Sequence, residues 1–226
     1  MVERILKMVA QTEPGKRSLR SFILRRRVAF LMHLLALVPR PLRVLDVGGT
    51  SMFWEAVGLA GDPGFEITLL NVRDQPMHYM NLMSFVGDAR RMPQFRDGEF
   101  DLVFSNSVIE HVGNYDDQMQ MAREVQRVGK RYFVQTPNYY FPLEPHFFFP
   151  FFQFLPVDLR VFLLRLTSLG WHKRTRERAE AVKAVRSVRL LRKQEVQQLF
   201  PGASILEERF CGLVMSFIAY KGCAKA

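Results

Sequence analysis

The chain has 226 residues, of which 48% are hydrophobic and 24% charged, with a formal net charge of +10. This length and composition exclude intrinsic disorder and allow one sizeable core. Two cysteines, Cys211 and Cys223, are too few for a disulfide framework or a cysteine-rich metal site, and we expect no metal site. The low cysteine content favours a reducing cytoplasm as the compartment.

The positive charge is concentrated in two segments of the chain. Residues 1–43 contain ten Lys or Arg against two acids, and residues 158–193 contain eleven against three, whereas the segment between them is acidic. Such basic segments suit contact with an anionic membrane surface or the collection of anionic acceptors. Two solvated helical faces would give the same pattern, so both interpretations stay open. Nucleic acid is the less favoured partner, because its binding modules spread basic residues over the binding face.

Residues 17–38 are expected to form an amphipathic helix within an N-terminal helical segment at residues 1–40. Residues 28–38 are apolar, but this run is too short to span a bilayer, and Pro39 ends it. Packing against the core is the favoured role for this helix, and lying on a membrane surface is the alternative. We therefore expect a cytoplasmic protein, with membrane association left open.

From residue 43 onwards, short apolar runs alternate with segments of helical spacing. Strands are expected at residues 43–47, 66–71, 82–86, 100–105 and 131–136. Helices are expected at residues 51–60, which Gly61 ends, and at residues 115–128. This alternation predicts an α/β fold, with a doubly wound, mostly parallel sheet and helices on both of its faces.

The alternation stops at residues 138–190 and then resumes. Residues 191–200 are expected to form a helix, and residues 203–210 and 213–220 two strands that pair antiparallel at the sheet edge. The expected organisation after the N-terminal segment is a core at residues 41–137, an inserted lid at residues 138–190, and a C-terminal helix and strand pair at residues 191–226.

The inserted lid is aromatic and basic. Eight of the twenty phenylalanines fall between Phe141 and Phe162, and four prolines interrupt them. Prolines at this density exclude a regular membrane-spanning helix. Rings beside the basic stretch at residues 171–193 suit an acceptor with an apolar body and an anionic group. A contribution to the core, a dimer contact and a wedge at a membrane surface remain alternatives.

Polar residues and glycines follow the expected strands. Asp46 ends the first strand and is followed by Gly48, Gly49 and Thr50, and Asp88 follows the third strand. Ligands of open α/β sheets bind outside the carboxyl ends of the strands, and glycine there lets a ligand approach the backbone. Carboxylates at that edge favour cations and hydrogen-bond donors over phosphate, which predicts a nucleoside-like ligand. Turn caps are the alternative role for each Asp.

Three segments together resemble a known family. They are VLDVGGTS at residues 44–51, GDA at residues 87–89 and DGEFDLVFSNSVIEHV at residues 97–112. They are similar to the seven-strand class I methyltransferases with a Rossmann-like sheet, and especially to the broad small-molecule and lipid group with a methyltransferase type 11 domain. The resemblance implies S-adenosyl-L-methionine as the cofactor.

The resemblance also implies roles for individual residues. Asp46 and the loop after it would meet the methionine part of the cofactor, Asn71 the ribose, Asp88 and Ala89 the adenine, and the end of the fourth strand the methyl group. The residues so implied are Asp46, Gly48, Gly49, Thr50, Asn71, Asp88, Ala89, Ser105 and Asn106.

The chain departs from the family pattern at two places. Thr50 and Met52 stand where the family has further glycines, so the loop is less open. Asn71 stands where the family has an acid, and its amide can still bond a hydroxyl, although without charge assistance. Asp74 is close enough in sequence to substitute for that acid.

Two histidines are candidate bases for the acceptor. His111 follows Glu110 after the fourth strand, where similar enzymes line the acceptor pocket with such a pair, and His146 lies in the inserted lid. Either ring could deprotonate a hydroxyl near neutral pH, and structural packing is the alternative for both. We expect transfer of a methyl group to a small-molecule or lipid-like acceptor, at oxygen. An RNA methyltransferase and a non-catalytic binding or membrane-associated protein on the same fold are the other interpretations.

Overall fold

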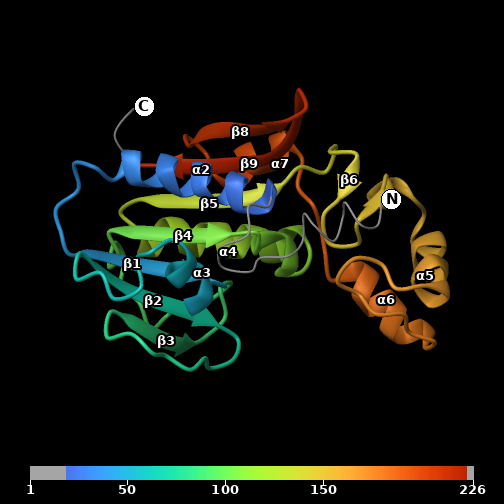
Figure 1. The fold of residues 1–226 in the computed structure, drawn as a ribbon, viewed down its shortest axis with the longest axis horizontal. Helices are drawn as coiled ribbons and strands as arrows, with labels where there is room; N and C mark the ends of the chain where they lie inside the picture. Colours follow the sequence, from blue (N-terminus) through green and yellow to red (C-terminus); the bar gives the residue numbers. More distant parts are fainter. Residues whose placement is uncertain (1–18, 223–226) are drawn as a thin grey trace.

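A seven-stranded sheet organises the chain in the computed structural model, which describes residues 19–222 (Figure 1). The strand order is β3-β2-β1-β4-β5-β9-β8. The strands are β1 (Leu42–Val47), β2 (Phe65–Asn71), β3 (Leu82–Val86), β4 (Leu102–Asn106), β5 (Tyr132–Pro137), β8 (Ser204–Phe210) and β9 (Leu213–Lys221). β1 to β5 pair in parallel, whereas β9 pairs antiparallel with both β5 and β8. The predicted fold class is therefore confirmed, with strand bounds shifted by a residue or two.

The chain changes direction across the sheet between β1 and β4. β1, β2 and β3 follow one another toward one edge, and the chain then returns to place β4 on the other side of β1. Asp46 in β1 lies opposite Phe104 in β4, so the carboxyl ends of these two strands lie side by side. In open sheets of this type, such a switch point forms the ligand crevice.

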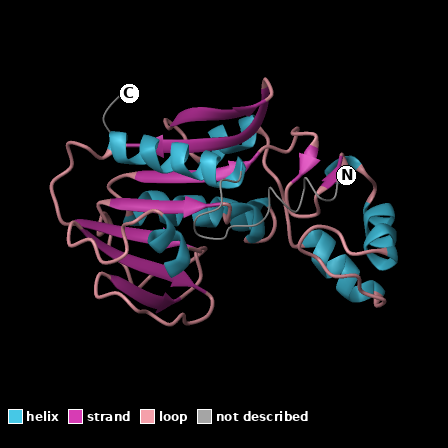
Figure 2. Cartoon of the chain, in the orientation of Figure 1, coloured by secondary structure: helices cyan, strands magenta, loops and turns pink. Residues whose placement is uncertain are grey.

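Helices cover both faces of the sheet (Figure 2). α2 (Leu19–Leu34) and α3 (Ser51–Ala56) cover one face, where Leu34 and Trp54 share a buried cluster with Val44 of β1. α4 (Tyr115–Val128) and α7 (Lys193–Leu199) contribute to the second cluster, which includes Leu45 of β1. Neighbouring strand residues contribute to opposite clusters because side chains alternate between the faces of a strand.

The N-terminal helix packs on the core, as favoured from the sequence, but its expected amphipathic division is wrong. Leu31 and Leu34 are buried, and Arg27 lies on the same face with only 8% of its surface exposed. Phe22, by contrast, is exposed. Arg27 is tolerated on the buried side because Glu208 of β8 pairs with it. Residues 17 and 18 of the expected helix, like Cys223, lie outside the described residues.

α3 is shorter than the predicted helix at residues 51–60. It ends at Ala56, and the glycine that stops it is Gly58, with φ +76°, although Gly61 is left-handed too. The backbone N–H groups of Leu59 and Ala60 both donate to the carbonyl of Trp54. Gly58 takes this position because a left-handed residue after a helix costs glycine no Cβ strain.

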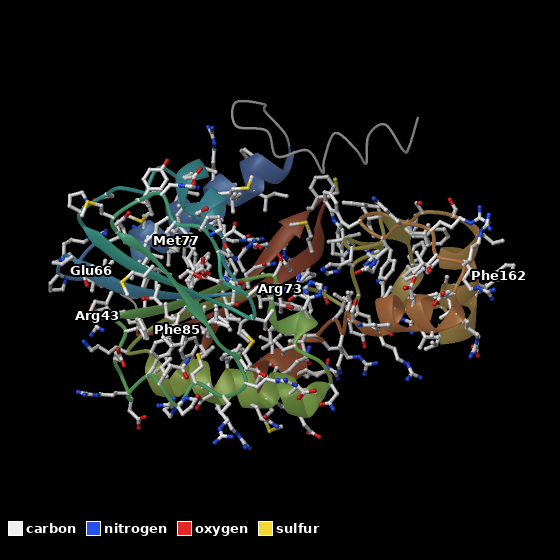
Figure 3. The ribbon with its side chains drawn as sticks, turned by 90° about the horizontal axis from the view of Figure 1, so that it is seen from below. Arg43, Glu66, Arg73, Met77, Phe85 and Phe162 are labelled. Carbon is white, nitrogen blue, oxygen red and sulfur yellow. The ribbon has the colours of Figure 1, made fainter. Side chains whose placement is uncertain are left out.

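The insertion at residues 138–190 lies beyond the carboxyl ends of β1, β4 and β5, on the right in Figure 1. Its elements are β6 (Leu143–Glu144), β7 (Phe149–Pro150), the short helix η2 (Phe152–Phe154), α5 (Val157–Leu166) and α6 (Arg178–Arg186). It has a buried cluster of its own, which includes Phe147, Phe152 and Leu164. Figure 3 shows Phe162 of α5 on the outer side of this unit. In the described part of the chain, no helix is long and apolar enough to cross a membrane.

Candidate functional site

The turn after β1 requires glycine at position 48. Gly48 has φ +75°, and a Cβ built there would lie 2.6 Å from both methyl carbons of Val108. Its N–H donates to the carbonyl of Leu70 in β2 over 2.8 Å, which ties the turn to the neighbouring strand. Any larger residue would strain the backbone and collide with Val108.

The carboxyl group of Asp46 is buried beneath this turn. Trp54 of α3 donates its indole N–H to Asp46 Oδ2 over 2.8 Å, and a Cβ on Gly49 would fall 1.6 Å from the same oxygen. Oδ1 has no hydrogen-bond partner among residues 19–222. Burial raises the pKa of Asp46 to about 7, against the opposing effect of the Trp54 hydrogen bond. The site therefore contains an acceptor oxygen without a donor.

The end of β2 supports the glycine turn from the side. Asn71 donates its side-chain N–H to the carbonyl of Gly49 over 2.9 Å, and Gln75 donates to the same oxygen over 3.3 Å. Asp74 accepts a hydrogen bond from Ser84 over 2.6 Å. The amide of Asn71 thus already donates one N–H to the loop. The carboxylate of Asp74 is already bonded to Ser84 of β3.

Asp88, at the turn after β3, is ionised and paired. Hydrogen bonds from Arg90, the shortest of 2.6 Å, hold the pKa of Asp88 below its usual range. Arg90 also bonds Asp117 of α4 over 2.9 Å. Ala89 packs against the core. An adenine amino group that reached Asp88 would share the carboxylate with Arg90.

The expected residues at the end of β4 make contacts within the protein. Ser105 is fully buried and donates to the carbonyl of Val47 over 3.2 Å, so it joins β4 to β1. Asn106 accepts a hydrogen bond from Arg27 of α2. Thr50 is exposed and precedes α3 as its N-cap, but its side chain makes no capping bond.

His111 and His146 lie together, although the first belongs to the short helix η1 (Ile109–His111) and the second to the insertion. Their ring centroids are 4.7 Å apart and the rings are perpendicular. Glu144 accepts from Nδ1 of His146 over 2.7 Å and from its backbone N–H over 2.8 Å. His111 Nδ1 lies 3.3 Å from the carbonyl oxygen of Ser187. The fold thus unites both candidate bases expected from the sequence.

Glu110 lies beside the two histidines and is fully buried. Its Oε2 accepts from Thr136 of β5 over 3.1 Å, while Oε1 has no hydrogen-bond partner in the described chain and lies 3.8 Å from His146 Nε2. Burial raises the pKa of Glu110 to about 7, although the charge of His146 opposes the shift.

The two histidines respond to this environment in opposite directions. Burial and then the charge of His146 lower the pKa of His111. Burial also disfavours the charged form of His146, but the hydrogen bond and charge of Glu144 and the charge of Glu110 outweigh it, so the pKa of His146 is raised.

A cavity of about 360 Å³ has Glu144, the hydrogen-bond partner of His146, in its wall, while neither histidine belongs to its lining. Aromatic rings and arginines make up much of the lining, which includes Tyr139, Phe147, Phe152, Arg160, Arg189 and Arg192. Nε of Arg160 is buried without a partner among residues 19–222. The cavity therefore combines apolar walls with cationic side chains.

Residues 42–132 match the family model described as a methyltransferase domain. They form a class I, S-adenosyl-L-methionine-dependent methyltransferase domain.

Similarity to solved structures extends over the rest of the chain. A structure described as a SAM-dependent methyltransferase from Aquifex aeolicus has a TM-score of 0.51 and 12% identity, and the match covers 97% of both chains. A structure from Bordetella parapertussis, described as a possible exported protein, has a TM-score of 0.53 and 16% identity over 97% of this chain and 79% of the other. At these identities the similarity shows the fold.

The curated relatives share a shorter segment. Two proteins of Mycobacterium tuberculosis described as uncharacterized are 39% identical over 67 residues, which is 30% of this chain. The matched segment spans 23% of the length of those relatives.

The methyltransferase family implies S-adenosyl-L-methionine, and the end of β1 fits this cofactor. The unpartnered Asp46 Oδ1 can accept from an ammonium or a bridging water, and the carboxylate of Asp88 lies two strands away.

Several residues of the candidate site were not expected from the sequence. Trp54, Glu144 and Arg160 were not expected to take part, and no metal site was expected where Glu110, His111 and His146 now group together. The spacing Glu144-Pro145-His146 was a usable signal, because a carboxylate two residues from a histidine can hold its ring.

Proposed function

We propose that the chain moves the methyl group of S-adenosyl-L-methionine onto an oxygen of a small or lipid-like acceptor that has an apolar body and an anionic group. One observation carries this proposal. The cavity of about 360 Å³ shares Glu144 with His146, beyond the carboxyl ends of the strands, where ligands of this fold bind.

The lining of the cavity supports an amphiphilic acceptor. Phe147 and Phe152 stack with ring centroids 4.3 Å apart and offer apolar contact area. Arg189 already binds Glu195, and Arg192 lies over the ring of Tyr139. Nε of Arg160 has no hydrogen-bond partner among residues 19–222, so Arg160 is the arginine that we propose to bind a carboxylate or phosphate.

For the cofactor, we propose that Asp46 Oδ1 accepts from the methionyl ammonium, directly or through water, while Gly48, Gly49 and Thr50 bound the same pocket. The side-chain oxygen of Asn71 is the atom proposed for a ribose hydroxyl, since its N–H already supports the loop. Adenine would lie against Asp88 and Ala89. Ser105 and Asn106 act indirectly here, by holding β4 to β1 and to Arg27.

The bound cofactor supplies a methyl group on a sulfonium, which is already a good leaving group. The residues of the chain then have to align the acceptor hydroxyl and receive its proton. His146 is our first candidate in the metal-free protein, because Glu144 holds Nδ1 and leaves Nε2 to accept the proton. His111 is the second candidate, and its lowered pKa keeps its ring neutral.

A radiolabelled-methyl assay tests the proposal. Hydroxylated fatty acids and hydroxylated lipid phosphates are offered in parallel with uncharged hydroxylated lipids and with RNA. We expect label in the anionic amphiphiles, and we expect Arg160→Met to raise their KM about tenfold while binding of S-adenosyl-L-methionine is unchanged. Arg178→Met, an exposed change in α6, serves as the control. Label confined to RNA, or no label in any acceptor, contradicts the proposal.

A further inference from the structure

Three side chains at the end of β4 and in the insertion have the composition and spacing of a metal site. Glu110, His111 and His146 each offer one ligand atom, and these atoms all lie within 4.8 Å of one another. We infer that Glu110, His111 and His146 bind one divalent transition-metal ion. Two imidazoles and one carboxylate are a ligand set that Zn²⁺ and Fe²⁺ use in open sites.

The groups around both histidines direct one ring nitrogen toward the cluster. Metal-bound histidines almost always donate their other ring N–H to a carboxylate or a carbonyl. Glu144 takes Nδ1 of His146 over 2.7 Å, and the Ser187 carbonyl lies 3.3 Å from Nδ1 of His111. With Nδ1 engaged in each ring, Nε2 is the nitrogen available to an ion.

One oxygen of the Glu110 carboxyl group has a hydrogen-bond partner in the described chain, and the other is the one we propose as the metal ligand. Oε2 accepts from Thr136, which orients the carboxyl group, whereas Oε1 is buried and unpartnered in the part of the chain that the structure describes. His146 Nε2 lies 3.8 Å from Oε1, beyond hydrogen-bond range. A buried, unsatisfied carboxyl oxygen is costly, and a cation bound to it would remove that cost.

The spacing is compatible with coordination after small side-chain rotations. Bonds of about 2.0–2.1 Å at tetrahedral angles place ligand atoms roughly 3.4 Å apart. The pair formed by Glu110 Oε1 and His146 Nε2 is close to that value at 3.8 Å. Glu110 is buried while His111 is exposed, so the cluster is open on one side. A water molecule or an acceptor oxygen can occupy the remaining position.

A role for the ion in catalysis rests on the proposed function. An acceptor hydroxyl bound to the ion would lose its proton to solvent, because a cation lowers the pKa of a coordinated oxygen. An oxygen lone pair then forms the bond to the methyl carbon while the carbon–sulfur bond breaks, and that electron pair stays on sulfur. In this state the nitrogen of His146 is a ligand, and the ion replaces the ring as the group that activates the hydroxyl.

Metal binding is tested directly on the untagged full chain after treatment with a chelator. Co²⁺ is titrated while its visible absorption is followed, and Zn²⁺ is titrated by calorimetry, without cofactor or acceptor. We expect one ion per chain. Glu110→Gln and His146→Asn should abolish binding, and Glu144→Gln should weaken it about 10- to 100-fold through the loss of its hold on His146.

The control is His78→Asn, which removes an exposed histidine outside the cluster and should leave the affinity unchanged. Circular dichroism checks that each variant is folded. If a variant of a ligand residue does not fold, Glu144→Gln still tests the inference, because Glu144 is not itself a ligand. No binding by the folded wild type, or equal affinity in Glu144→Gln and wild type, overturns the inference. Because binding is read without methyl transfer, failure of the metal site and failure of the proposed function give different results.

Discussion

The indole N–H of Trp54 donates to Oδ2 of Asp46 over 2.8 Å, inside the core and directly below the Gly48 turn. This bond joins α3 to the carboxyl end of β1. It fixes the carboxyl group in the space that a side chain on Gly49 would occupy. The side of the site proposed for the cofactor is therefore built around a buried polar pair.

Replacement of Trp54 by Phe is expected to destabilise the chain by about 1–3 kcal/mol, because Asp46 Oδ2 then lacks its donor inside the core. Urea denaturation followed by circular dichroism measures the change. The control is Trp171→Phe at an exposed tryptophan, where the expected change is within about 0.5 kcal/mol. Equal midpoints for the two variants would mean that the buried bond contributes nothing.

Asp46→Asn is expected to alter how stability depends on pH. Burial raises the pKa of Asp46 to about 7 from 3.8, so between these values the folded chain holds a proton that the unfolded chain has lost. The stability of the wild type relative to the variant should therefore be highest near pH 4 and fall, by on the order of 3 kcal/mol, as the pH rises to 7. Denaturation from pH 4 to pH 8 measures this difference. Parallel profiles for both proteins would show that Asp46 is already ionised at low pH.

Gly48→Ala is expected to cost about 2–5 kcal/mol, from the left-handed backbone and from overlap with Val108. Gly58→Ala is the matched control, since Gly58 has φ +76° but nothing within 4 Å of its Cβ position. Gly58→Ala should therefore lose only the free energy that the left-handed backbone costs. Adding Val108→Ala to Gly48→Ala should recover the stability lost to overlap with Val108, while the loss from the left-handed backbone remains. If the double variant recovers nothing, Val108 is not the cause.

Arg27→Met is expected to destabilise the chain by on the order of 3 kcal/mol, because it leaves Glu208 with a partly buried, unpaired charge. Arg178→Met removes one partner of an exposed ion pair with Asp158 and should change stability by less than about 0.5 kcal/mol. Thermal and urea unfolding compare the two. Adding Glu208→Gln to Arg27→Met should restore part of the loss, and a further loss instead would contradict the pairing.

The sheet was predictable from sequence because its strands carry local signals. Runs such as residues 43–47 and 82–86 are short and apolar and are followed by glycine, and each became a strand. The predicted end of α3 was wrong because Gly58 and Gly61 both have the left-handed conformation. Only the hydrogen bonds that the carbonyl of Trp54 accepts from residues 59 and 60 show that the helix ends before Gly58. A local sequence pattern does not decide which of two nearby glycines ends a helix.

The contacts within the candidate site were less predictable because the residues that form them are distant in the chain. Asp46 and His111 could be named from motifs, yet their neighbours depend on packing between elements. Arg27 and Glu208 meet across 181 positions, and no periodicity carries that information. Glu110 and His146 likewise meet only because the insertion lies at the end of β4.

The insertion keeps a hydrophobic cluster that is separate from the two clusters of the sheet. Substitutions that reshape the cavity around Phe152 and Arg160 therefore leave the packing under β1 untouched. Under the proposed function, acceptor preference and cofactor retention would thus evolve independently. Exchange of the cavity wall at residues 147–160 would then change the acceptor while the strand ends proposed for the methyl donor stay intact.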